Sequence, residues 1–440
     1  MAAAEQSITI HEPLVGNSNN NNNHYPYSDG PNDAVLKKHL AKLETFLRIF
    51  GFCQYSFFSG LLSWLAYLVI AILLPLWTLY YAYCSNCEQY QIRTFELQIF
   101  ASQALVAGIS LLCISHNLRK HGIRKLLFVD RYHGMAQFTP QYLEKFKGFY
   151  RSLVTWVVVG FLLKAAREVV RAIYLHDELW WWSVAVLVVS LVSWTYSTIL
   201  FLSGTALFNL VGNLQIIHFE NYGKLLERDM DVSVYIEEHM RLTHYLSKIS
   251  HRFRIFLLLE FLVVSASQFV ALLQTTGNKG IINFLNGGDF LVLSIVELVG
   301  IVLCLNAAAK ISHRAQAIGS VASRWHMLVT ANSSDVSASF MSNGGNPDPL
   351  NTVGSLTVNY SESDLESTSD FIPLPATVQL TSQMTSFHKR QAFVTYVQSN
   401  TGGFSIFGWI IDRMLINTIF FIELSLVFFV LGKTITFTTR

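Results

Sequence analysis

The stretch Trp409–Phe437 decides the fold, and it reads WIIDRMLINTIFFIELSLVFFVLGKTITF. From Met414 onward it is apolar, and its strongly polar residues are Asn417, Glu423 and Lys433. A helix of about 20 residues crosses a hydrocarbon core of ~30 Å, so this segment is long enough to span a membrane. A carboxylate at mid-depth is costly in lipid, so Glu423 should face protein or water. We interpret the segment as the wall of an ion pathway. The alternative is a terminal anchor whose Glu423 pairs with a neighbouring helix.

The composition places the whole chain in a membrane. Of its 440 residues 52% are hydrophobic and 14% are charged, whereas soluble domains carry about 25% charged residues. Long continuous apolar runs favour helices over a barrel. The net charge of +2 is too small to suggest a nucleic-acid partner. The chain is therefore predicted to be an all-α integral membrane protein whose first partner is the lipid bilayer.

Seven apolar segments are expected to span the membrane, and the last of them is the segment quoted above. Pro75 is a candidate kink in the first span. The six earlier segments cover residues 57–83, 95–115, 153–175, 180–210, 255–274 and 290–309.

Basic residues predict the orientation of these spans. They concentrate in the loops after the second, fourth and sixth spans, whereas the opposite side holds Arg93, Lys279 and Arg440. Cytoplasmic loops carry the excess of Lys and Arg, so the N-terminus should be cytoplasmic and the C-terminus extracytoplasmic. A G-protein-coupled receptor has the opposite orientation.

Four regions follow from composition. Residues 1–34 form a polar tail expected to be disordered, and residues 35–330 form a six-span bundle with cytoplasmic helical extensions. Residues 331–375 form a cytoplasmic loop expected to be disordered, in which Ser361 and Ser363 are candidate phosphorylation sites because acidic residues follow them. Residues 376–440 combine a cytoplasmic helix with the seventh span. At the start of the bundle, Val35–Phe50 reads as a basic amphipathic helix that leads into the membrane.

The pentapeptide KISHR occurs twice, at Lys248–Arg252 and at Lys310–Arg314. Both copies should lie at the inner membrane surface on antiparallel helices. They are either basic interface anchors or a paired site for lipid headgroups or a neighbouring subunit. The candidate contact residues are Lys248, His251, Arg252, Lys310, His313 and Arg314.

Charged residues within the spans are the best pointers to function. The third span holds Lys164, Arg167, Glu168 and Arg171, and Lys164 and Glu168 can pair at i, i+4. One interpretation is internal neutralisation of these bases by Glu260, Glu297 and Glu423 on later spans. The other is a polar cavity, open to the outside, that binds a small organic ligand. Its candidate lining residues are Lys164, Arg167, Glu168, Arg171, Gln103, Tyr196 and Gln268.

Catalytic patterns are missing from the sequence. It contains no G-x-S-x-G, no H-E-x-x-H and no P-loop, and its histidines lack the spacing of metal ligands. We therefore expect no enzymatic activity, no cofactor and no metal site.

The chain contains the stretches NLRKHGIRKLLFVDRY, KISHRFRIFLLLEFLVVSASQFVALLQTTG, FLNGGDF, HKRQAFVTYVQSN and FGWIIDRMLINTIFFIELSLVFFVLGKTI. They resemble the plant gustatory-receptor-like family, a plant membrane family catalogued as a domain of unknown function and similar in predicted fold to insect odorant and gustatory receptors. The resemblance covers nearly the whole chain after the tail. It implies a seven-helix subunit of a homo- or hetero-tetramer that binds an unknown small molecule in its outer half. The last span of each subunit would line a cation pore.

On this interpretation the pore-lining candidates are Asn417, Phe421, Glu423, Ser425 and Phe428. The membrane is expected to be the plasma membrane or an endomembrane. Two rival functions stay open. One is a membrane transporter, and the other is a non-conducting receptor or scaffold that signals through the cytoplasmic loop.

Overall fold

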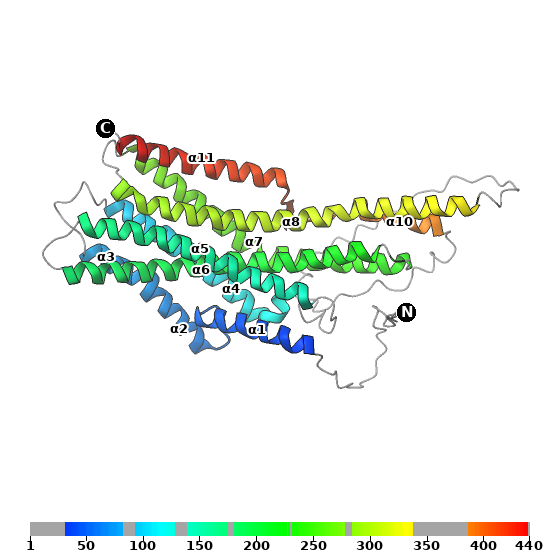
Figure 1. Ribbon diagram of the computed structural model, residues 1–440, viewed down its shortest axis with the longest axis horizontal. Coiled ribbons are helices and arrows are strands. Elements are labelled where there is room, and N and C mark those ends of the chain that lie inside the picture. The colour runs from blue at the N-terminus through cyan, green and yellow to red at the C-terminus, as the bar shows by residue number, and fades with distance from the viewer. Residues whose placement is uncertain are drawn as a thin grey trace, which may run out of the picture.

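The computed structural model describes residues 31–81, 93–127, 139–174, 180–226, 228, 231–277, 284–337 and 386–438. Within these residues the protein is helical apart from one short hairpin, and the helices lie along a common long axis (Figure 1). The elements are α1 (Pro31–Ile49), α2 (Phe57–Tyr67), the π-helix η1 (Leu68–Leu73), α3 (Leu74–Tyr81), α4 (Arg93–Leu126), α5 (Thr139–Tyr174), α6 (Trp180–Leu225), α7 (Val232–Gly277), α8 (Phe284–Ser337), α10 (Ser386–Ser399), β1 (Ser405–Ile406), β2 (Trp409–Ile410) and α11 (Arg413–Thr438).

Membrane-type helices dominate this fold. Five described segments are long and apolar enough to cross a membrane: the continuous stretch from α2 to α3, and parts of α4, α6, α7 and α8. The apolar part of α11, Met414–Leu426, is shorter, and α5 carries several charges. The chain is thus an all-α protein of membrane type. Residues 1–30 and the candidate phosphorylation sites Ser361 and Ser363 lie outside the described residues.

Three helices are much longer than a bilayer is thick. The 54 residues of α8 extend over about 81 Å, and the 46 residues of α6 and of α7 over about 69 Å each. A hydrocarbon core needs only ~30 Å, so each helix continues beyond any membrane that it crosses. α10 packs against the extension of α8 (Figure 1). There Trp325 of α8 stacks edge-on with Tyr235 of α7 at 5.4 Å and with Phe393 of α10 at 5.9 Å. We expected an irregular loop from residue 331, and α8 instead continues to Ser337.

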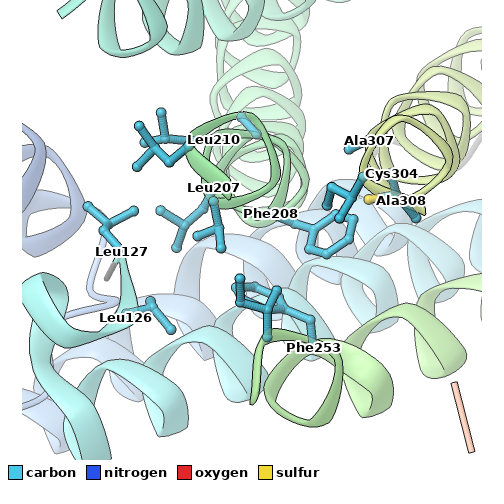
Figure 2. Close-up of a cluster of buried hydrophobic side chains, with 14 of the residues drawn as sticks. Leu126, Leu127, Leu207, Phe208, Leu210, Phe253, Cys304, Ala307 and Ala308 are labelled. Carbon is cyan, nitrogen blue, oxygen red and sulfur yellow. The ribbon is translucent and has the colours of Figure 1, made fainter. Parts of the chain in front are cut away.

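The centre of the bundle is a continuous apolar core. Figure 2 shows Phe208 of α6 directed toward Cys304, Ala307 and Ala308 of α8, with Phe253 of α7 beneath it. The rings of Phe208 and Phe253 lie 5.2 Å apart. The small side chains of α8 allow α6 to approach closely, because the protein interior leaves little room for voids.

The α1 helix has the amphipathic face that its sequence predicts. Leu36, Leu40, Leu43 and Leu47 are all buried. This face packs against α5 and α4, and the Phe46 ring lies 6.2 Å from that of Phe149 on α5. The amphipathic helix predicted from the sequence is therefore present, and protein covers its apolar face.

The candidate kink at Pro75 takes the form of a π-helix. Segment η1 ends at Leu73, directly before the turn that contains Pro75. Proline lacks an amide hydrogen, and its ring clashes with the carbonyl of the preceding turn. The wider i→i+5 pattern of a π-helix relieves that clash, so the first apolar helix continues without a break.

Candidate functional site

Charged residues of α5 form a buried ion-pair cluster with residues of α4 and α8. Lys164 Nζ lies 2.6 Å from Glu168 Oε1 and 2.5 Å from Asp289 Oδ1. Arg167 Nη1 lies 2.7 Å from Asp289 Oδ2 and 2.9 Å from Glu168 Oε1. Arg171 Nη1 lies 3.3 Å from Glu96 Oε1. Three cations face three anions here, so the cluster carries no net charge when all six groups are ionised.

This cluster confirms one prediction and corrects another. The i, i+4 pair of Lys164 and Glu168 is present. However, the acids that neutralise α5 are Glu96 and Asp289 in addition to Glu168, and not the three later glutamates named from the sequence. Asp289 was missed because it follows two glycines in a stretch that reads as a loop, although it lies in the first turns of α8.

A second polar cluster connects α4, α6, α7 and α8. Ser102 donates to Glu297 Oε1 at 2.8 Å, and Gln268 donates to Glu297 Oε2 at 3.4 Å. Gln103 donates to the carbonyl of Trp194 at 3.1 Å. The predicted pocket residues Gln103 and Gln268 are therefore engaged in interhelical hydrogen bonds, and Tyr196 is partly buried against the core.

The structure divides the five pore-lining candidates between two faces of α11. Glu423 is 1% exposed and accepts a hydrogen bond from the hydroxyl of Ser265 on α7. The other four candidates, Asn417, Phe421, Ser425 and Phe428, are exposed, and Phe421 is 63% exposed. Successive residues turn by about 100° in a helix, so these four positions share one stripe and Glu423 lies on the far side. Glu423 therefore cannot line the same wall as the other four, and the neighbour-paired alternative describes its contacts.

The two KISHR copies have different surroundings. In the first copy Lys248 is buried, and Arg252 Nη1 donates to the carbonyl of Lys125 at 3.1 Å. In the second copy Lys310 and His313 are exposed, and Arg314 Nη2 lies 3.0 Å from Glu220 Oε1. His251 is half-buried. The basic residues thus do not form one symmetrical pair.

The serines of the two copies do act together. The backbone amide of Ser405 donates to the hydroxyl of Ser250 at 3.2 Å, and the amide of Phe404 donates to the hydroxyl of Ser312 at 3.0 Å. Two antiparallel helices therefore hold consecutive residues at the start of the hairpin that leads into α11. The charged members of the repeat gave no indication of this contact. The repetition of an identical serine was the signal that could have found this contact.

The hairpin is itself well fixed. Its strands pair Ser405 with Ile410, and the loop residues Phe407 and Gly408 have φ angles of 48° and 84°. Two positive φ values are typical of a type I′ turn, the turn that suits a two-residue hairpin. Phe404 is fully buried, and its ring lies 5.4 Å from that of Phe208 in the central core. The guanidinium of Arg254 lies over the Phe407 ring at 4.8 Å. These contacts attach the segment that precedes α11 to α6, α7 and α8.

The fold and these sites define an all-helical membrane-type protein with buried polar clusters and a last helix attached through a serine-held hairpin. The chain belongs to the family described as protein of unknown function (DUF3537), whose model matches residues 38–422. No curated protein matches the chain. No solved structure matches it either.

Proposed function

We propose that the protein is a subunit of a ligand-gated cation channel in which α11 lines the pore. One observation carries the proposal. α11 packs against α7 and α8 and leaves a stripe of Asn417, Phe421, Ser425 and Phe428 uncovered. Asparagine is an unfavourable side chain to expose to lipid, so this stripe suits water or a second protein surface better than a bilayer. Four such helices around an axis would enclose a pathway with apolar constrictions at the phenylalanines.

Seven spans would result if α5 and α11 join the five candidate segments. The charges in the second half of α5, from Lys164 to Arg171, are turned into the ion-pair cluster, and the outer surface of its apolar part carries aliphatic side chains. Val154, Val158, Leu162, Val169 and Ile173 are each more than 40% exposed. A helix whose charges are paired internally can cross a bilayer. With the N-terminus cytoplasmic, the extensions of α6, α7 and α8 would project into the cytosol, where neighbouring subunits of a tetramer would meet.

A small molecule would bind in the outer half, close to the clusters of Lys164 and Glu297. Arg171 is the most exposed cation of the first cluster, at 17% of its side chain, and is the group that an incoming ligand would meet first. The membrane would be the plasma membrane or an endomembrane.

The test is electron microscopy of the purified protein followed by current recording in planar bilayers. A fourfold ring that conducts cations supports the proposal. A monodisperse monomer that gives no current overturns it and favours a transporter or a non-conducting receptor. An epitope fused after Arg440 should be labelled on intact cells if the protein reaches the plasma membrane. Labelling of a surface-resident protein only after permeabilisation would reverse the proposed orientation.

A further inference from the structure

An apolar cavity of about 320 Å³ lies between α7, α8, the hairpin and the first turns of α11. Its walls include Leu257, Phe261, Ile301, Cys304, Phe407 and Leu415. The cavity shares no lining residue with the polar clusters of Lys164 and Glu297. It is bounded by both strands of the hairpin and by the helix that follows them. A molecule bound there would therefore contact the first turns of α11 directly.

A single charged side chain, Glu260 of α7, lines this cavity. Glu260 is 2% exposed, and its Oε1 has no hydrogen-bond partner among the described residues. Glu297 differs, because it accepts from Ser102 and Gln268. A buried carboxylate without a partner is costly, and buried charges are normally paired. The lining around Glu260 offers it aliphatic and aromatic groups and the Cys304 thiol.

We propose that this cavity binds a small amphiphile with a compact apolar body and a single amine head, and that the ammonium group pairs with Glu260. The apolar body would replace the missing van der Waals contacts of the cavity walls, and the ammonium would supply the missing partner of the carboxylate. Apolar pockets with one precisely placed polar group are typical ligand sites. Binding of the amine at this cavity does not depend on whether α11 lines a pore.

The experiment measures binding of radiolabelled adamantylamine to the purified full-length protein in lipid nanodiscs, with empty nanodiscs subtracted. Adamantylamine should bind saturably, and adamantanol, which has the same cage and no charge, should compete at least about tenfold more weakly, since the ion pair is lost. Equal competition by the alcohol would overturn the proposal.

Two variants locate the site. Glu260→Gln keeps the shape of the side chain and removes its charge, and it should weaken adamantylamine binding at least about tenfold. Leu305→Phe, which enlarges a partly buried side chain on the α8 wall of the cavity, should also weaken binding. The matched control is Glu297→Gln, which changes a buried glutamate outside the cavity and should bind like the parent. Equal binding by Glu260→Gln and the parent would overturn the proposal, as would saturable binding lost equally in Glu297→Gln. Gel filtration and thermal unfolding identify variants that are folded, and Glu260→Gln and Leu305→Phe each test the site without the other.

Discussion

Ser250 and Ser312 occupy the same position in the two KISHR copies and accept hydrogen bonds from the consecutive amides of Ser405 and Phe404. Ser250, Ser312 and Phe404 are buried, and Ser405 is partly buried. One sequence element, used on two antiparallel helices, therefore fixes the two residues from which the hairpin and then α11 start.

Replacing both serines by alanine should destabilise the protein. Each substitution removes an acceptor from an amide in a largely buried site, and leaving such a donor unsatisfied costs about 1–3 kcal/mol. The double variant should unfold at a lower temperature than either single variant in a detergent thermal melt. The control is Ser320→Ala, because Ser320 is an exposed residue of α8 that bonds only within its own helix, to Ala317. A double variant as stable as the control would show that the two hydroxyls do not hold the hairpin.

Removing one acid from the ion-pair cluster should destabilise the protein more than removing an acid and a base together. Asp289→Asn leaves Lys164 and Arg167 short of one negative charge in a buried site, and breaking a buried pair in this way costs about 3–5 kcal/mol. The double variant Lys164→Met with Asp289→Asn restores neutrality. It should therefore lose less stability than the sum of the two single variants, as measured by melting temperature in a double-mutant cycle. Additive losses would contradict the coupling.

Helical periodicity correctly indicated which residues of α1 are buried, since Leu36, Leu40, Leu43 and Leu47 repeat at the spacing of one helix face. It could not indicate the surface that they cover, because protein and lipid are equally apolar. α11 shows the same limit more severely. It is apolar around most of its circumference, so its sequence does not reveal which of two opposite faces, that of Glu423 or that of Phe421, packs against the rest of the bundle.

The polar contacts were harder to predict for a related reason. Lys164 and Glu168 are close in sequence, so their pairing follows from helix geometry alone. Asp289 lies more than 100 residues further on, and only the packing of α5 against α8 brings it to Lys164. The serine contacts of the hairpin likewise depend on three segments far apart in the chain.

Close packing of α6 on α8 should make Gly300 intolerant of even a methyl group. A Cβ added there would lie 2.1 Å from Cζ of the Phe201 ring, which is itself buried. Gly300→Ala should therefore lower the free energy of unfolding by about 1–3 kcal/mol, the usual cost of overpacking. Gly148→Ala is the matched control, because a Cβ on that α5 residue would meet nothing within 4 Å. It should be neutral or stabilising by about 0.5–1 kcal/mol, since alanine favours helix over glycine. Denaturant or thermal melts compare the two, and equal effects would contradict the close approach.

Under the proposed channel function, the exposed stripe and the buried face of α11 should respond differently. A cysteine at Ser425 lies on the exposed stripe, so a positively charged methanethiosulfonate reagent should reduce the cation current by adding a positive charge to an otherwise uncharged pore wall. The parent protein, with its native cysteines, is treated in the same way as the control.

Glu423→Gln should instead leave ion selectivity unchanged, because Glu423 is buried against Ser265 of α7. Reversal potentials measured in asymmetric salt distinguish the two cases. A large loss of cation selectivity in Glu423→Gln, together with no reaction at Ser425→Cys, would mean that α11 turns its other face to the pore.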